Sequence, residues 1–152
     1  MARPSASRAI LIGGLIAGAF DITFAFIFYS LRGSTPLRIL QSIASGLLGA
    51  SAFRGGMKTA ILGFFLHFFI AISAAVIYYL VSRKLAFMIE YAIICGILYG
   101  LCIYVVMNFV VLPLSAIPFK PSHAASVVIA GLLIHMFGIG LPISLAVRRY
   151  SK

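Results

Sequence analysis

Four long stretches that are almost free of charge constrain this chain more than any other feature. A helix needs about 20 apolar residues to cross the roughly 30 Å hydrocarbon core of a bilayer, and each stretch reaches that length. They run from Ala9 to Leu31, Met57 to Val81, Met88 to Leu112 and Ala124 to Val147. Charged residues and prolines fall mostly between them. The sequence therefore predicts an all-α integral membrane protein with four transmembrane helices in a single domain, residues 1–152.

The composition supports this prediction and excludes other classes. Of the 152 residues, 63% are hydrophobic and 9% are charged, whereas a soluble domain has roughly 45–50% apolar and about 25% charged residues. Twelve bases accompany two acids, so the net charge of +10 reflects a shortage of acids. Because the bases lie at the ends of the predicted helices and not on one face, we expect no nucleic-acid partner. The expected partner is the lipid bilayer.

An even number of spans places both termini on one side of the membrane. The terminal side, with the loop between the second and third spans, carries seven bases, and the opposite side carries five. They are Arg3, Arg8, Arg83, Lys84, Arg148, Arg149 and Lys152 on the terminal side, and Arg32, Arg38, Arg54, Lys58 and Lys120 on the other. Because loops rich in Lys and Arg stay in the cytoplasm, this small bias predicts cytoplasmic termini.

The segment 36–53 is too short to span the membrane and has a different pattern. An apolar stripe at helical spacing comprises Leu40, Ile43, Ala44, Leu47 and Leu48. Bases near both ends indicate that the segment begins and ends on one side of the membrane. Two interpretations remain open, a helix that lies in the interface and a re-entrant half-helix that caps a cavity.

Motifs in the first half of the chain recur in the second half at fixed offsets. Gly14-Leu-Ile-Ala-Gly18 and Pro36-Leu-Arg38 recur 82 residues later as Gly96-Ile-Leu-Tyr-Gly100 and Pro118-Phe-Lys120, and Gly63-Phe-Phe-Leu-His67 recurs 68 residues later as Gly131-Leu-Leu-Ile-His135. The two offsets differ by 14 residues, close to the length of the amphipathic segment. The matches predict two parallel helical hairpins, residues 9–84 and 88–150, with that segment inserted in the first. Chance similarity between apolar helices is the alternative.

Gly14 with Gly18 and Gly96 with Gly100 are GxxxG pairs, which allow helix backbones to approach closely in lipid. In two parallel repeats the first and third spans run in the same direction. We therefore expect these four glycines to form a central contact between the first and third spans. Faces of small residues also offer a surface for a homo-oligomer.

Five strongly polar side chains fall well inside the predicted spans, and they are Asp21, His67, Glu90, Asn108 and His135. Glu90 and Asn108 are close enough to the helix ends to reach the interface. Asp21, His67 and His135 can approach the midplane, where an ionised carboxylate is costly unless it has a partner. These three residues therefore form the candidate functional site.

Three interpretations of Asp21, His67 and His135 remain open. In the first, they form hydrogen bonds between helices in a structural or accessory protein without transport activity. In the second, they relay protons or ions in a small transporter or channel-like protein. In the third, His67 and His135 face each other across the repeat axis and ligate haem b in an electron carrier. The first two need no cofactor.

The sequence contains no motif of a soluble enzyme. GxSxG, HExxH, P-loop and dinucleotide-binding patterns are absent. Asp21 and Glu90, the two acids, are predicted at different depths, so we expect no two-acid catalysis and no enzyme activity. Cys95 and Cys102 are seven residues apart and predict no metal site.

The run Pro36-Leu-Arg-Ile-Leu-Gln-Ser-Ile-Ala-Ser-Gly-Leu-Leu-Gly49, followed by Gly55-Gly56 and the helix of His67, resembles a family of small uncharacterised bacterial inner-membrane proteins with four helices. The similarity covers most of the chain. It implies a multi-pass protein of the bacterial inner membrane, and it implies neither an activity nor particular functional residues.

Overall fold

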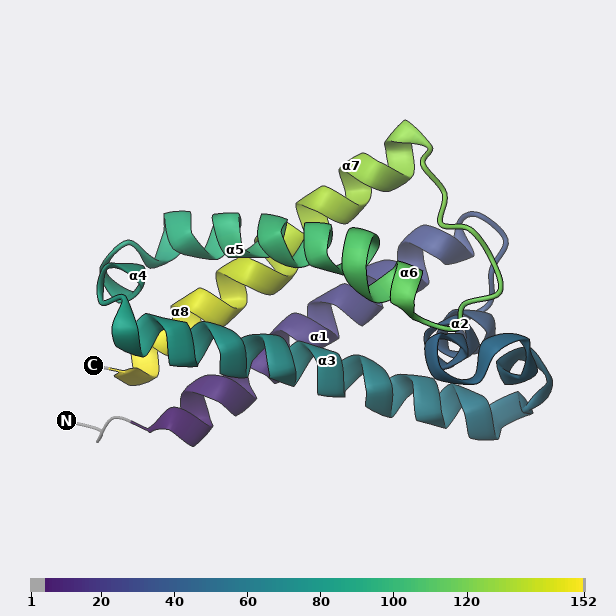
Figure 1. Cartoon of the computed structure of the whole chain (residues 1–152), viewed down its shortest axis with the longest axis horizontal. Coiled ribbons are helices and arrows are strands. Elements are labelled where there is room, and N and C mark those ends of the chain that lie inside the picture. The colour runs from purple at the N-terminus through teal and green to yellow at the C-terminus, as the bar shows by residue number, and fades with distance from the viewer. Residues whose placement is uncertain (1–4, 152) are drawn as a thin grey trace.

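The computed structural model of the chain describes residues 5–151, and within that range it is helical throughout, with turns and loops but no strand (Figure 1). The elements in order are α1 (Ala6–Ser30), α2 (Pro36–Leu48), the 3-10 helix η1 (Gly49–Arg54), α3 (Gly56–Lys84), α4 (Phe87–Glu90), α5 (Ala92–Val106), the π-helix η2 (Met107–Val111), α6 (Leu112–Leu114), α7 (Ala125–Leu133), the π-helix η3 (Ile134–Gly140) and α8 (Leu141–Ser151).

Four continuous helical runs are long and apolar enough to cross a membrane, which confirms the predicted all-α membrane fold. They are Ala6–Ser30, Gly56–Lys84, Ala92–Leu114 and Ala125–Ser151, called the first to fourth spans below. The first, second and fourth begin within three residues of the predicted positions. The third begins later than expected because the chain turns at Tyr91, which leaves α4 as a separate short helix.

The two ends of the described chain lie together (Figure 1). The backbone N–H of Ser5 donates a hydrogen bond of 3.0 Å to the carbonyl of Tyr150. The Ser5 hydroxyl in turn accepts from the backbone N–H of Arg8 and caps α1. Both ends therefore share one end of the bundle, as an even number of spans requires. The counted bases Arg3 and Lys152 lie outside the described residues.

The first GxxxG pair packs against the second span. A Cβ atom added to Gly14 would lie 2.8 Å from the Cα of Ile72, and one added to Gly18 would lie 2.8 Å from the ring of Phe68. Both neighbours belong to α3. The two glycines therefore allow α1 and α3 to cross at close range.

The second GxxxG pair packs against the fourth span. A Cβ atom on Gly96 would overlap the Ser144 hydroxyl, and one on Gly100 would overlap the carbonyl of His135. The predicted central contact between the first and third spans is therefore wrong. Each glycine pair joins the two antiparallel spans of its own hairpin, because glycine removes the steric barrier to a close approach of their backbones. The two hairpins meet where α1 packs on the fourth span.

The two hairpins use the same register of close contacts. In the first hairpin, Gly14 contacts Ile72 and Gly18 contacts Phe68. Adding 82 to each glycine number and 68 to each partner number gives the pairs Gly96 with Gly140 and Gly100 with Met136. Both of these pairs are in close contact in the second hairpin. Lipid solvation alone does not impose a common register on two hairpins. This agreement supports the duplicated hairpin, which stays a prediction.

The bundle is closed in the half that contains the termini. A buried cluster there comprises Ala9, Ala17, Ala75, Tyr78, Ile139, Ile143 and Val147. Tyr78 donates a hydrogen bond to the Met88 carbonyl, and Tyr99 of α5 donates one of 2.7 Å to the Ala74 carbonyl of α3. The first contact joins α3 to α4, and the second joins the second and third spans beside the small residues of the core.

Removing the hydroxyl of Tyr99 tests that join. We expect Tyr99→Phe to lower the free energy of unfolding by about 1 kcal/mol, the typical net contribution of a hydrogen bond in a folded protein. The measurement is the thermal unfolding midpoint in detergent. Tyr91→Phe is the matched control, because Tyr91 is 56% exposed, and it should leave the midpoint unchanged. Equal midpoints for all three proteins would mean that the hydrogen bond to Ala74 contributes nothing.

Helix α2 buries only part of the apolar stripe that its sequence suggests. Its buried residues are Ile39, Gln41, Ala44 and Ser45, whereas Leu47 of the apolar stripe is 63% exposed. Gln41 donates a hydrogen bond of 3.1 Å to the Gly56 carbonyl. The mixed buried face has a physical reason, since lipid solvates an apolar side chain as well as protein does, whereas small and polar side chains are better satisfied inside.

The two π-helices each lie just before a proline. Pro113 follows η2, and Pro142 follows η3. A proline in a helix lacks the N–H group and its ring clashes with the carbonyl four residues earlier, which here belongs to Phe109 or Gly138. Both carbonyls lie within the π segments, where the wider turn accommodates the clash. Single π turns of this kind often occur at functional sites.

Candidate functional site

A cavity of about 610 Å³ lies between the four spans, in the half of the bundle away from the termini. Its wall is built from α1, α2, α3, α5 with η2, the connection 115–122, and α7 with η3. The core cluster closes it toward the termini, because Ala17 and Ile139 belong to both the cluster and the cavity wall. Most of the lining is apolar, and a few polar groups converge on the space, as is typical of small-molecule sites.

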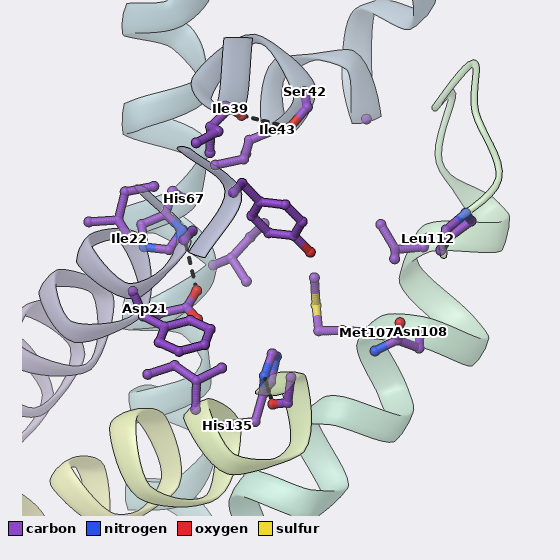
Figure 2. A pocket seen from close by; sticks show the side chains of 18 of the residues that line it. Asp21, Ile22, Ile39, Ser42, Ile43, His67, Met107, Asn108, Leu112 and His135 are labelled. Atoms are coloured by element: carbon purple, nitrogen blue, oxygen red, sulfur yellow. Dashed lines mark hydrogen bonds and ion pairs between the residues drawn. The ribbon is translucent and has the colours of Figure 1, made fainter. Parts of the chain in front are cut away.

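All three residues predicted as the polar centre line this cavity (Figure 2). Asp21 is on α1, His67 on α3 and His135 on η3. The Asp21 Oδ2 and His67 Nδ1 atoms are 3.9 Å apart. This distance exceeds that of a direct hydrogen bond but is within the range of an ion pair when His67 is protonated. The structure thus pairs Asp21 with His67 directly.

The hydrogen-bond partner of His67 defines which nitrogen carries a proton. Nε2 lies 2.8 Å from the backbone carbonyl of Gly18. A carbonyl can only accept, so Nε2 carries the proton and donates it. The Nδ1 atom then faces Asp21 either with its lone pair or with a second proton. A single additional proton can therefore reside on Asp21 or on His67 Nδ1, and the pair is neutral overall in either case.

The Asp21 carboxyl has few polar partners in the protein. Its side chain is 25% exposed, that of His67 is 11% exposed, and no group among residues 5–151 donates a hydrogen bond to it. A carboxylate in an apolar medium needs a proton, a cation or donors. The cavity can supply any of these to Asp21, as a proton, a bound cation or water.

His135 takes a different set of partners. Its Nδ1 donates a hydrogen bond of 2.8 Å to the Gly131 carbonyl, one turn earlier in the same span. Its ring meets that of Tyr104 edge to face, with the ring centroids 5.4 Å apart. Within the described part of the chain Nε2 has no hydrogen-bond partner. His135 therefore contributes an acceptor to the cavity wall without contacting the Asp21 and His67 pair.

Sequence reasoning dismissed one residue that the cavity contains. Asn108 lies on η2, lines the cavity and donates a hydrogen bond of 2.9 Å to the Tyr104 carbonyl. Its position near the helix end predicts a side chain that reaches the membrane interface, but in the structure the cavity occupies that half of the bundle and Asn108 lines it. Glu90 lies in α4 at the opposite end and takes no part in the cavity. The sequence feature that could have drawn attention to Asn108 is Pro113, because a proline inside a span indicates an irregular helix just before it.

The arrangement does not favour the haem alternative. Haem ligation by two histidines needs a free nitrogen on each ring directed at a common iron. Nε2 of His67 donates to Gly18 and its Nδ1 faces Asp21. Ligation would require His67 to give up one of these partners, so this alternative stays a prediction without support from the geometry. Among residues 5–151 no group of three or more His, Cys, Asp or Glu side chains could hold a metal ion.

Together these features define a class, a multi-pass α-helical membrane protein with an apolar cavity and an Asp and His pair at mid-span. No protein-family model matches the chain, and comparisons with curated proteins and with solved structures find no match. The function is therefore argued from the geometry of the cavity.

Proposed function

We propose that this chain is a small proton-translocating membrane transporter whose proton-binding centre is the Asp21 and His67 pair. The observation that carries the proposal is the position of that pair, with Oδ2 and Nδ1 3.9 Å apart on the wall of a 610 Å³ cavity. Ionisable residues inside membrane spans commonly mark paths of protons and ions. Histidine exchanges its proton near neutral pH, which suits such a path.

The cavity has the asymmetry that a transporter needs. It is bounded by α2 and the connection 115–122 on one side of the bundle and closed by the core cluster on the other. Alternating access requires a binding site near mid-span that is closed toward at least one side of the membrane, and the core cluster provides that closure toward the termini. The π segments η2 and η3 lie in the third and fourth spans and contribute to the cavity wall. Helix irregularities in membranes are tolerated where they line such a cavity.

The proposal includes the location and assembly of the protein. We place it in the bacterial inner membrane with both termini in the cytoplasm, on the strength of the family resemblance and of the small excess of bases on the terminal side. The cavity then lies in the outer half of the membrane. A homo-oligomer stays part of the proposal, but its contacts cannot be the four GxxxG glycines, because these pack inside each hairpin. Helix α2, which contributes Ile39, Ser42 and Ile43 to the cavity wall, is proposed as its re-entrant cap.

A structural role is the second candidate, and one observation favours it. The hydrogen bond from His67 to the Gly18 carbonyl joins α3 to α1 at their closest crossing. A histidine that served only this purpose would stabilise the bundle without moving protons. Flux measurements separate the two roles, because only the transporter role predicts a current.

The direct test is proton flux into reconstituted vesicles. Purified protein is placed in vesicles with a pH-sensitive dye inside, the potential is clamped with potassium and valinomycin, and a pH gradient is imposed. We expect the gradient to collapse faster than in protein-free vesicles, because the pair offers a proton-binding step within the membrane barrier. If the two rates are equal and substitutions at Asp21 or His67 only lower stability, the structural role is correct and the transporter proposal is wrong.

A further inference from the structure

Helix α1 presents an acid and aromatic rings to the cavity along a single face. Asp21, Phe24 and Phe28 all line the cavity and are three, then four, residues apart, which places them on one stripe of the helix. The rings of Phe24 and Phe28 stack with their centroids 5.3 Å apart and an angle of 20° between their planes. The stripe therefore leads from two stacked rings to one carboxyl group.

Two guanidinium groups of the chain lie over aromatic rings of the cavity wall. The Arg32 guanidinium carbon lies 3.6 Å from the centre of the Phe28 ring, and that of Arg38 lies 4.2 Å from the centre of the Phe53 ring. Both phenylalanines line the cavity. Aromatic faces attract cations through the ring quadrupole, and here they hold delocalised organic cations at two places. The chemistry that the wall recognises is thus visible in the structure.

We propose, on the basis of the proton-translocating function above, that the substrate of the cavity is a lipophilic organic cation, which displaces the proton held by Asp21 and His67. The cation would place its apolar groups against Phe24 and the other rings and its charge toward the Asp21 carboxylate. A volume of 610 Å³ lies in the range of cavities that hold drug-sized molecules.

The charge balance of the exchange follows from the residues in the wall. Besides Asp21, the charged and titratable groups that line the cavity are Tyr29 of α1, Arg38 of α2, His67 of α3, Tyr104 of α5 and His135 of η3. Asp21 is the acid among them. When the cation binds, one proton leaves the pair for water and Asp21 is ionised. His67 is then neutral, and its Nε2–H still donates a hydrogen bond to the Gly18 carbonyl. One positive charge replaces another, so the cavity keeps its net charge.

The charges of Arg32 and Arg38 do not contradict this assignment. Both are exposed residues, and their guanidinium groups rest on Phe28 and Phe53 respectively. Water and salt screen an exposed charge over about 8 to 10 Å. The Asp21 carboxyl lies deeper, against apolar walls, where screening is weaker. A cation that passes the two arginines is therefore attracted to the base of the cavity.

The test uses two ions of the same size and opposite charge. Tetraphenylphosphonium and tetraphenylborate are titrated separately into the purified full-length protein in detergent, and heat is measured in two buffers of different ionisation enthalpy. We expect the phosphonium ion to bind at least about tenfold more tightly than the borate ion, with release of a proton. Its affinity should fall as the pH is lowered, because protons compete for the same pair.

Variants locate the binding site. Asp21→Asn should abolish the proton release, and Phe24→Leu should weaken binding of the phosphonium ion several-fold. Glu90→Gln is the matched control, because it removes the other acid of the chain outside the cavity, and it should bind as the wild type does. Equal affinities for the two ions, or binding of the phosphonium ion without proton release, would overturn the cation assignment.

The outcome also separates this inference from the proposed function. If the vesicles conduct protons but the phosphonium ion does not bind, the cavity relays protons alone and the substrate inference is wrong. If neither proton flux nor binding is found, both proposals are wrong.

Discussion

In reconstituted vesicles, Asp21→Asn is expected to reduce proton flux to the rate of protein-free vesicles. Asparagine has nearly the same shape as aspartic acid but cannot take up and release a proton in the physiological range. Asp21 is the partner of His67 Nδ1 and the acid of the cavity wall. Without it, a proton on His67 would be an uncompensated charge in an apolar cavity, which is costly. The proton-binding step is therefore lost.

The same substitution should scarcely change folding, since no protein group among residues 5–151 donates a hydrogen bond to Asp21 and its partner lies 3.9 Å away. Glu90→Gln is the matched control and should retain both flux and unfolding midpoint, because Glu90 is exposed in α4. Dye-based flux and thermal unfolding in detergent are measured on the same preparations. Wild-type flux in Asp21→Asn would exclude Asp21 from the proton path.

The second large effect concerns the crossing of α5 and the fourth span. We expect Gly100→Ala to lower the free energy of unfolding by about 1–3 kcal/mol, the usual cost of overpacking a close contact. The new Cβ atom would overlap the His135 carbonyl oxygen and lie 2.5 Å from the Met136 Cα atom. Both neighbours are backbone atoms, which cannot rotate away, so the two helices have to separate. His135 and the cavity wall would shift with them.

Gly46→Ala is the control for this substitution. Gly46 also lies inside a helix, but a Cβ atom there would meet nothing nearer than the Ser115 Cβ atom at 3.8 Å. Alanine is favoured over glycine in a helix by up to about 1 kcal/mol, so this variant should unfold at the same temperature or a higher one. If Gly100→Ala is as stable as Gly46→Ala, the two spans do not approach as closely as the structure indicates.

The spans could be predicted from the sequence because the thickness of the bilayer fixes the length of an apolar helix. The candidate site could be predicted for a related reason, since a carboxyl group such as Asp21 has no inexpensive place among apolar residues. Both arguments depend on composition along the chain. Neither argument depends on which helices are neighbours.

The arrangement of the helices could not be predicted in the same way. In water, the hydrophobic face of a helix shows where its partner lies, but in lipid all faces are apolar and the pattern loses this information. Gly14 and Gly96 indicated close packing correctly, yet nothing in the sequence identified α3 and the fourth span as their respective partners. The buried face of α2, with Gln41 and Ser45 inside, could not be read for the same reason.

Gly18 takes part in two features at once. Its missing side chain allows Phe68 of α3 to approach α1, and its carbonyl accepts the Nε2 proton of His67. The angle and depth at which α1 and α3 cross therefore determine the orientation of the imidazole ring. Any sliding of one helix along the other would turn Nδ1 toward or away from Asp21. Movement of α1 against α3 is thus coupled to the occupancy of the proton site, so a conformational change of this hairpin would also change how strongly Asp21 and His67 hold their proton.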